Sequence, residues 1–165
     1  MIQVTEHAEL AQFLSQQYLC ESLTVAEVSI LLHYLTVLHF NNNDIMSDVG
    51  DVGDELYFVV KGEIALVIPD ASNEYEIVRS GVGEMLGMMS FFDKRARSVR
   101  MVTRADDTQV LRLSRAMYKR MKVEHPYIAI NLAEQAIMSL DKLFRSVSSD
   151  YAQFSHYLYG SGSKI

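Results

Sequence analysis

Cysteine is nearly absent from this sequence, and long apolar runs are absent altogether. The single cysteine, Cys20, excludes an internal disulfide and is typical of a reducing compartment, so we expect a cytoplasmic location. No apolar run reaches the roughly 18–20 residues that span a bilayer, so we expect no membrane partner. The stretch 1–9 carries acidic residues and no basic segment, which does not fit a signal peptide. Because Cys20 lies among apolar helix positions, we expect a buried, inert thiol.

Clustered histidines and nucleophile motifs are also missing. A metal-dependent oxygenase on a cupin-type β-roll needs two or three histidines and a carboxylate around one metal ion, yet the sequence has no His-x-His pair. It has no glycine-flanked serine nucleophile of the Gly-x-Ser-x-Gly kind, and Asp51, Asp54 and Glu55 lie in a turn where solvated acids are common. We therefore expect no enzyme activity, no catalytic residue and no metal site. The scattered histidines are His7, His33, His39, His125 and His156.

The composition fits one globular domain, because the 165 residues are 49% hydrophobic and 22% charged. The net charge of −6 argues against general nucleic-acid binding, since nucleic-acid-binding domains are usually basic. The positive charge is nevertheless concentrated, because nine of the fifteen Lys and Arg residues lie within 94–120. Either a small anionic ligand or a solvated basic face would explain this segment, and composition leaves both open.

Helical signals dominate the first part of the chain. Leu10, Phe13 and Leu14 follow helical spacing. Thr24 and Glu27 form a capping-box pattern, in which the threonine hydroxyl accepts a backbone N–H and the glutamate reaches back. The sequence therefore predicts two N-terminal helices, the second ending near residues 33–34.

From residue 35 the apolar period changes to that of short strands. Lys61-Gly62-Glu63 predicts a tight hairpin between two of them. Short strands separated by turns favour an antiparallel sandwich or barrel. We expect a mainly β fold with flanking helices (α+β), namely an antiparallel β-roll of the double-stranded β-helix or jelly-roll kind, with N-terminal helices and a long C-terminal helix. The predicted strands are Thr36–Phe40, Glu55–Val60, Ile64–Ile68, Glu74–Arg79, Arg100–Arg104 and Gln109–Leu113.

The last third of the chain predicts two helices. Ser114 is an expected N-cap, and His125-Pro126 ends one helix and starts the next. A heptad stripe then runs through the second helix. A stripe this long favours pairing with a second copy of the chain, and packing on the chain's own β-roll is the alternative. The stripe consists of Ile130, Ala133, Ile137, Leu140, Phe144, Val147, Tyr151, Phe154 and Leu158.

These patterns divide the chain into four segments. Residues 1–34 form an N-terminal helical segment, and residues 35–114 form the β-roll. Residues 115–159 form C-terminal lid and dimerisation helices, and residues 160–165 form a flexible tail because they are rich in glycine and serine.

One loop inside the predicted β-roll has the residues of an anion site. It begins at Gly87, continues through an apolar run at 88–92, and ends in a basic turn that contains Arg97 and Ser98. Backbone amides after a glycine turn can face an anion, and an arginine fork can hold two phosphate oxygens at once. The alternative is a surface loop with solvated basic side chains.

Three motifs in order resemble the cyclic-nucleotide-binding domain family of catabolite activators, protein kinase A regulatory subunits and cyclic-nucleotide-gated channels. The stretch 43–63 resembles the family's glycine-punctuated strand pair. The stretches 86–93 and 96–98 resemble its phosphate-binding cassette, and 110–114 resembles its closing strand and helix cap. The resemblance covers about residues 10–148 and implies this fold with a cyclic nucleotide in the β-roll.

The resemblance also implies which residues bind the ligand. Arg97 aligns with the arginine that holds the phosphate, and Arg95 is the competing candidate if the loop is out of register. Two departures stand out, because Met88 replaces the family's glutamate for the ribose 2′-hydroxyl and Ala96 replaces its proline. The ligand-binding residues that we expect are Leu86, Gly87, Met88, Met89, Arg97 and Ser98.

The resemblance implies a regulatory sensor that binds a cyclic phosphodiester and signals through its C-terminal helix. Cyclic AMP or cyclic GMP is the expected ligand, ahead of cyclic di-GMP, and no cofactor is required. The expected partners are a second copy of the chain and an effector protein. DNA is not expected, because no helix-turn-helix follows the long helix in the sequence. The alternative is a degenerate member that binds no nucleotide and serves as a dimeric protein-interaction module.

Overall fold

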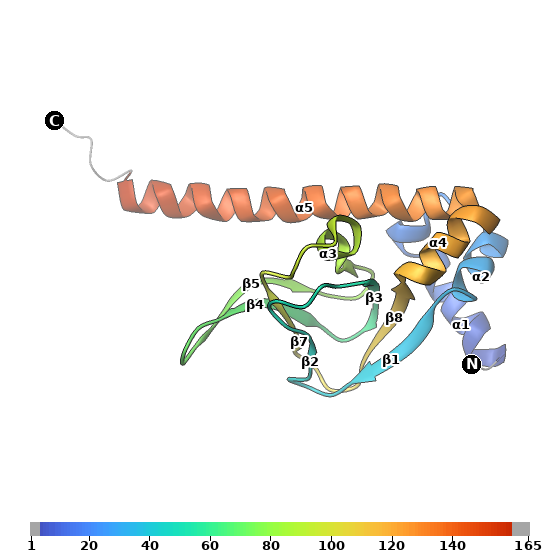
Figure 1. Ribbon diagram of the computed structural model, residues 1–165, viewed down its shortest axis with the longest axis horizontal. Helices are drawn as coiled ribbons and strands as arrows, with labels where there is room; N and C mark the ends of the chain where they lie inside the picture. The colour runs from blue at the N-terminus through green and yellow to red at the C-terminus, as the bar shows by residue number, and fades with distance from the viewer. Residues whose placement is uncertain (1–3, 160–165) are drawn as a thin grey trace.

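The computed structural model describes residues 4–159, and the tail predicted to be flexible over 160–165 lies outside them. Helices flank a β-roll (Figure 1). The helices are α1 (Val4–Ser15), the short 3₁₀ helix η1 (Tyr18–Cys20), α2 (Val25–Leu32), α3 (Met88–Asp93), α4 (Arg115–Glu124) and α5 (Pro126–Tyr159). The strands are β1 (Thr36–Phe40), β2 (Ile45–Ser47), β3 (Glu55–Lys61), β4 (Ile64–Pro69), β5 (Glu74–Ser80), β6 (Met85–Leu86), β7 (Arg100–Thr103) and β8 (Thr108–Ser114).

The strands form two four-stranded antiparallel sheets. The first has the order β1-β8-β3-β6 and the second the order β2-β7-β4-β5. Strands that are distant in sequence therefore lie side by side, as when Thr36 of β1 faces Arg112 of β8. This arrangement confirms the predicted antiparallel β-roll with N-terminal helices and a long C-terminal helix.

The predicted hairpin at 61–63 is wrong. β3 pairs with β6 and β8, whereas β4 pairs with β5 and β7, so the turn carries the chain from one sheet to the other. Gly62 has φ of +89°, and a Cβ there would lie 2.4 Å from Oγ1 of Thr108 on β8. The glycine thus serves a sharp corner packed against a neighbouring strand. A corner and a hairpin need the same residue type, so the local sequence does not distinguish them.

The helix ends follow the predicted capping signals. Thr24 accepts the N–H of Glu27 through its side chain, and the Glu27 carboxylate accepts the N–H of Thr24 at 2.7 Å, which completes the capping box. The Ser114 hydroxyl accepts the N–H of Met117 at the start of α4. Pro126 opens α5 directly after His125. These side chains satisfy backbone donors that a helix start leaves without partners.

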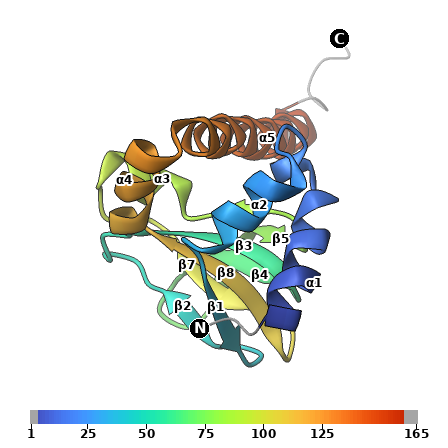
Figure 2. The same ribbon diagram turned by 90° about the vertical axis from the view of Figure 1, so that its right-hand side faces the viewer.

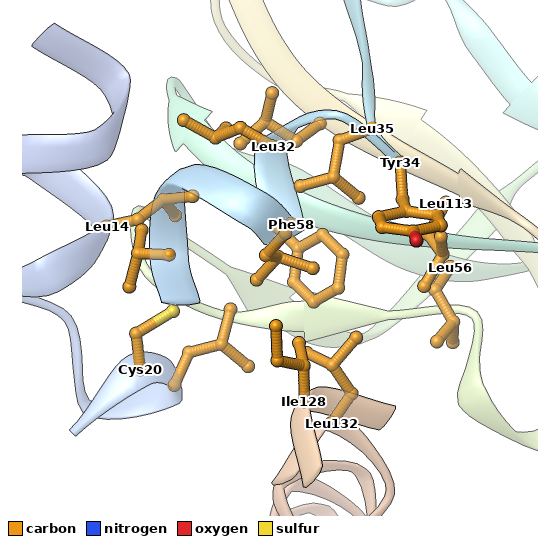
Figure 3. Close-up of a cluster of buried hydrophobic side chains, with 14 of the residues drawn as sticks. Leu14, Cys20, Leu32, Tyr34, Leu35, Leu56, Phe58, Leu113, Ile128 and Leu132 are labelled. Atoms are coloured by element: carbon orange, nitrogen blue, oxygen red, sulfur yellow. The ribbon is translucent and has the colours of Figure 1, made fainter. Parts of the chain in front are cut away.

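One hydrophobic core joins the N-terminal helices, the first sheet and α5. Leu14 of α1, Phe58 of β3 and Leu132 of α5 are fully buried within it (Figure 3). In Figure 2 α1 and α2 lie beside the roll, and α5 runs across its top. Burial of this core fixes α5 relative to the roll over its first turns.

The Cys20 thiol lies inside this core, as the sequence predicts (Figure 3). Burial raises the pKa of Cys20 to about 12. Since the thiolate is the nucleophile, we expect iodoacetamide at pH 8.5 to label the folded protein at least about 100-fold more slowly than the urea-unfolded chain. Fast labelling of the native protein, followed by mass spectrometry, would contradict this placement. The raised pKa also means that the thiol contributes less to stability as the pH rises above about 8.5, where the unfolded chain loses its proton.

Helix α5 continues far beyond the core. Ile128, Leu132 and Ala136 are buried, while later turns extend past the roll (Figure 1). Among residues 4–159 no helix is long and apolar enough to cross a membrane.

The predicted heptad stripe is largely exposed on α5. Ile130, Ile137, Phe144 and Tyr151 follow one another at heptad spacing, and their exposed fractions are 56%, 66%, 72% and 72%. We call these four residues the α5 stripe. The side chains of Phe154 and Leu158, the last members of the predicted seam, lie outside the described part of the chain.

Candidate functional site

The candidate site begins at a glycine turn between β6 and α3. Gly87 has φ of +89°, in the left-handed region. A Cβ at this position would lie 2.7 Å from the carbonyl oxygen of Glu55, so only glycine fits without moving β3. The turn directs the chain into the short helix α3, whose first amides have no acceptor within the helix.

The Arg97 side chain points inward from the loop after α3. Its guanidinium packs on Gly53, where a Cβ would lie 2.0 Å from Nη2, and Nη2 lies 3.5 Å from the Cβ position of Gly87. The backbone is fixed as well, because the Arg97 N–H donates to Asp51 O at 2.8 Å and Arg97 O accepts from Gly50 at 2.9 Å. Arg97 therefore lies between the β2–β3 loop and the glycine turn that opens α3.

The Arg97 guanidinium is a half-buried charge without an ion-pair partner among residues 4–159. Its Nε is buried and has no hydrogen-bond partner, and no carboxylate within residues 4–159 forms an ion pair with it. Burial lowers the pKa of Arg97, although Tyr57 and the nearby carboxylates of Asp51 and Glu55 act in the opposite direction. A partly buried cation without a partner is costly unless a ligand supplies the anion.

A cavity of about 660 Å³ opens beside Arg97, between the roll and α5. All six residues predicted to bind ligand line it, and so does the alternative, Arg95. Leu86 and Met88 are buried in its wall, Arg97 is half-buried, and Met89, Arg95 and Ser98 are exposed. The methionines therefore line the cavity without filling it. Its volume lies in the range of ordinary small-molecule sites.

A C-terminal lid was expected from the sequence, but the α5 residues that line the cavity were not predicted. Gln135, Met138 and Lys142 of α5 line the cavity, and so does Arg79 of β5. Their positions depend on how α5 crosses the roll, which no local pattern in the sequence records. Leu140 of the predicted heptad stripe lines the cavity, whereas Ile130, Ile137, Phe144 and Tyr151 are exposed.

An ion pair joins α5 to the roll at the cavity. Lys142 Nζ lies 2.6 Å from Oε1 of Glu84, and the other oxygen of Glu84 accepts the N–H of Gly81 at 2.8 Å. Burial acts to raise the pKa of Glu84, but Lys142 and the Gly81 N–H together hold it below its ordinary value. Such a partly exposed pair contributes about 0–1 kcal/mol to stability.

The side chains around the cavity include groups that suit an anionic ligand. Within residues 4–159 no three His, Cys, Asp or Glu side chains are placed to hold a metal ion. The cavity lining includes the cations Arg79, Arg97 and Lys142 and the Ser98 hydroxyl, which suit an anion, together with the carboxylates of Glu84 and Asp93.

Comparison with known proteins agrees with this geometry. A family model described as the cyclic nucleotide-binding domain matches residues 37–125. The chain belongs to this family. A cyclic AMP receptor protein from Thermus thermophilus is 31% identical over 116 residues, which cover 70% of this chain and 53% of the relative. The cAMP-dependent protein kinase regulatory subunit of Debaryomyces hansenii is 25% identical over 167 aligned positions, covering 97% of this chain and 36% of the relative.

The chain thus spans about half or less of the length of these curated relatives.

Solved structures agree on the fold. A cyclic nucleotide-binding domain from Methylobacillus flagellatus superposes with a TM-score of 0.76 at 21% identity, covering 88% of this chain and 82% of that one. The catabolite activator protein of Thermus thermophilus superposes with a TM-score of 0.67 at 28% identity, covering 84% of this chain and 64% of that one.

Proposed function

We propose that this domain is a regulatory sensor that binds a cyclic phosphodiester, cyclic AMP or cyclic GMP, in the cavity beside α5. The observation that carries the proposal is the half-buried Arg97 guanidinium, which faces the cavity and has no ion-pair partner within residues 4–159. Arg97 and the Ser98 hydroxyl hold the phosphate, and the loop from Leu86 to Met89 forms the floor under the sugar. Arg95, which is exposed, is the second candidate for the phosphate.

The proposed output is a change in the position of α5. Because α5 forms one wall of the cavity, a ligand that contacts this wall favours one position of the helix over others. The Lys142–Glu84 ion pair is the contact that such a movement changes first. An effector protein, or a second copy of the chain, then detects the new position. We also propose a cytoplasmic location, because Cys20 is a buried free thiol.

Calorimetry with cyclic AMP, cyclic GMP and cyclic di-GMP tests this function. Binding of a cyclic mononucleotide at micromolar to millimolar concentration, with one site per chain, supports it. Heat signals and melting temperatures that none of the three ligands changes at millimolar concentration would contradict it. That result would leave the alternative function, a dimeric interaction module that binds no nucleotide.

The α5 stripe supports the proposed homodimer. Heptad spacing presents Ile137 and Phe144 at equivalent positions of two paired helices, where they bury each other. We expect Ile137→Asp to weaken dimerisation at least about 100-fold, because two isoleucine side chains lose about 1.5–3 kcal/mol each. Sedimentation equilibrium measures the change. The control is Ser149→Asp, which adds the same charge at an exposed position away from the stripe. A wild-type monomer, or equal dimerisation of both variants, would contradict this interface.

A further inference from the structure

The position of the Arg97 guanidinium depends on one short loop. Residues 48–54 join β2 to β3, and Gly53 in this loop touches the guanidinium. The Arg97 N–H also donates to Asp51 in the same loop. The position of this loop therefore sets the position of the main charged partner of the proposed phosphate ligand.

Two side chains from other elements hold Gly53 by its backbone. Ser90 of α3 accepts the Gly53 N–H at 2.7 Å, and its hydroxyl donates to Arg95 O at 2.6 Å. Arg115, the first residue of α4, donates from Nη2 to Gly53 O at 2.8 Å. The N–H of Arg115 also donates to Asp54 O at 2.7 Å. Both polar groups of the Gly53 backbone are thus engaged from outside the loop.

Arg115 binds α3 with the same guanidinium. Its Nη2 lies 3.0 Å from Phe91 O and 3.3 Å from Ser90 O, and its Nε lies 3.3 Å from Phe91 O. Its Cζ lies 5.5 Å from the centre of the Phe91 ring. No ion pair to Arg115 occurs within residues 4–159. A cation that contacts only carbonyls and a ring, on two separate segments, serves to hold those segments together.

We propose that Arg115 is a positioning residue for ligand binding, which acts by fixing Gly53 against the guanidinium of Arg97. The inference rests on the proposed function of the cavity. Because Arg115 begins α4, and α4 leads into α5, the same contacts join the phosphate-binding loop to the helices that carry the output. Ligand held at Arg97 is thereby linked to the start of α4 through one side chain.

The first test needs no ligand. Arg115→Met keeps the length of the side chain and removes its donors, so we expect amide hydrogen exchange of Gly53 and Arg97, followed by NMR, to accelerate at least about tenfold. Exchange in the buried strand β8 should stay unchanged. Lys119→Met, an exposed change on the same helix, is the matched control. Unchanged exchange at Gly53 and Arg97 would overturn the proposal whatever the protein binds. If Arg115→Met fails to fold, Arg115→Lys, which keeps a cation but not the fork, answers the same question.

The second test separates positioning from general stability. We expect Arg115→Met to weaken cyclic AMP binding about tenfold, and to have no further effect in an Arg97→Met background, because both changes act through one contact. Gly53→Ala should reproduce the loss with Arg115 intact, since its Cβ displaces only the end of the Arg97 side chain. If wild-type protein binds and Arg115→Met binds equally well, or if the losses add, the proposal is wrong. Absence of wild-type binding rejects the proposed function instead, and the exchange test then decides the inference alone.

Discussion

Arg97→Met is expected to lower the affinity for a cyclic nucleotide by roughly 30- to 5,000-fold. The change removes a guanidinium that faces the cavity half-buried, and truncating a desolvated charge pair costs about 2–5 kcal/mol. The same change should leave the melting temperature of the ligand-free protein equal or higher, because burial already lowers the pKa of this unpaired cation. The affinity therefore falls without a loss of ligand-free stability. Calorimetry and thermal melts at one fixed salt concentration measure both.

Arg95→Met is the matched control, since Arg95 lies on the same loop with its side chain exposed. We expect it to lower the affinity only slightly, as a screened surface charge does. A large loss in Arg95→Met together with a small loss in Arg97→Met would assign the phosphate to Arg95.

Met88→Glu is expected to tighten cyclic AMP binding by about 10- to 100-fold. The resemblance implies a glutamate at this position for the ribose 2′-hydroxyl, and a hydrogen bond to a charged group contributes about 1.5–3 kcal/mol. Without ligand the variant should melt at a lower temperature, because Met88 is only 6% exposed and a buried carboxylate without a partner is costly. The gain in affinity should disappear with 2′-deoxy cyclic AMP.

Met89→Glu controls for the added charge, because Met89 is the exposed neighbour on the same cavity wall. The Met89→Glu variant should not discriminate between cyclic AMP and 2′-deoxy cyclic AMP. Equal affinities of wild type and Met88→Glu for both ligands would mean that the sugar lies elsewhere in the cavity.

Features that depend only on residues adjacent in the sequence could be predicted. The Thr24 capping box, the Ser114 cap and the Pro126 helix start all act within one turn of helix, so their signals are complete in the local sequence. Strand pairing is different, because the turn at Gly62 has the same residue type whether its strands pair or separate. Strand β2 was not predicted, because it has only three residues and its burial does not alternate along the strand.

The candidate site likewise combines residues that the sequence predicts with residues that it does not. Gly87, Met88 and Arg97 belong to one continuous stretch of sequence, and Gly87 and Arg97 lie in motifs that carried the family resemblance. Other parts of the site come from elsewhere in the chain: Gly53 contacts the Arg97 guanidinium, Arg115 holds Gly53, and Lys142 of α5 pairs with Glu84 at the cavity. Only the three-dimensional packing of α4 and α5 on the roll brings them together.

The pairing of β1 with β8 has a consequence for how the chain acquires its shape. Because Thr36 faces Arg112, the first strand of the roll gains its neighbour only after the last strand has been synthesised. Proteins dominated by such non-local contacts fold slowly, and their unpaired edges are exposed to aggregation meanwhile. A nascent chain truncated before Ser114 should therefore remain protease-sensitive on the ribosome, and no shorter fragment of the roll should fold independently.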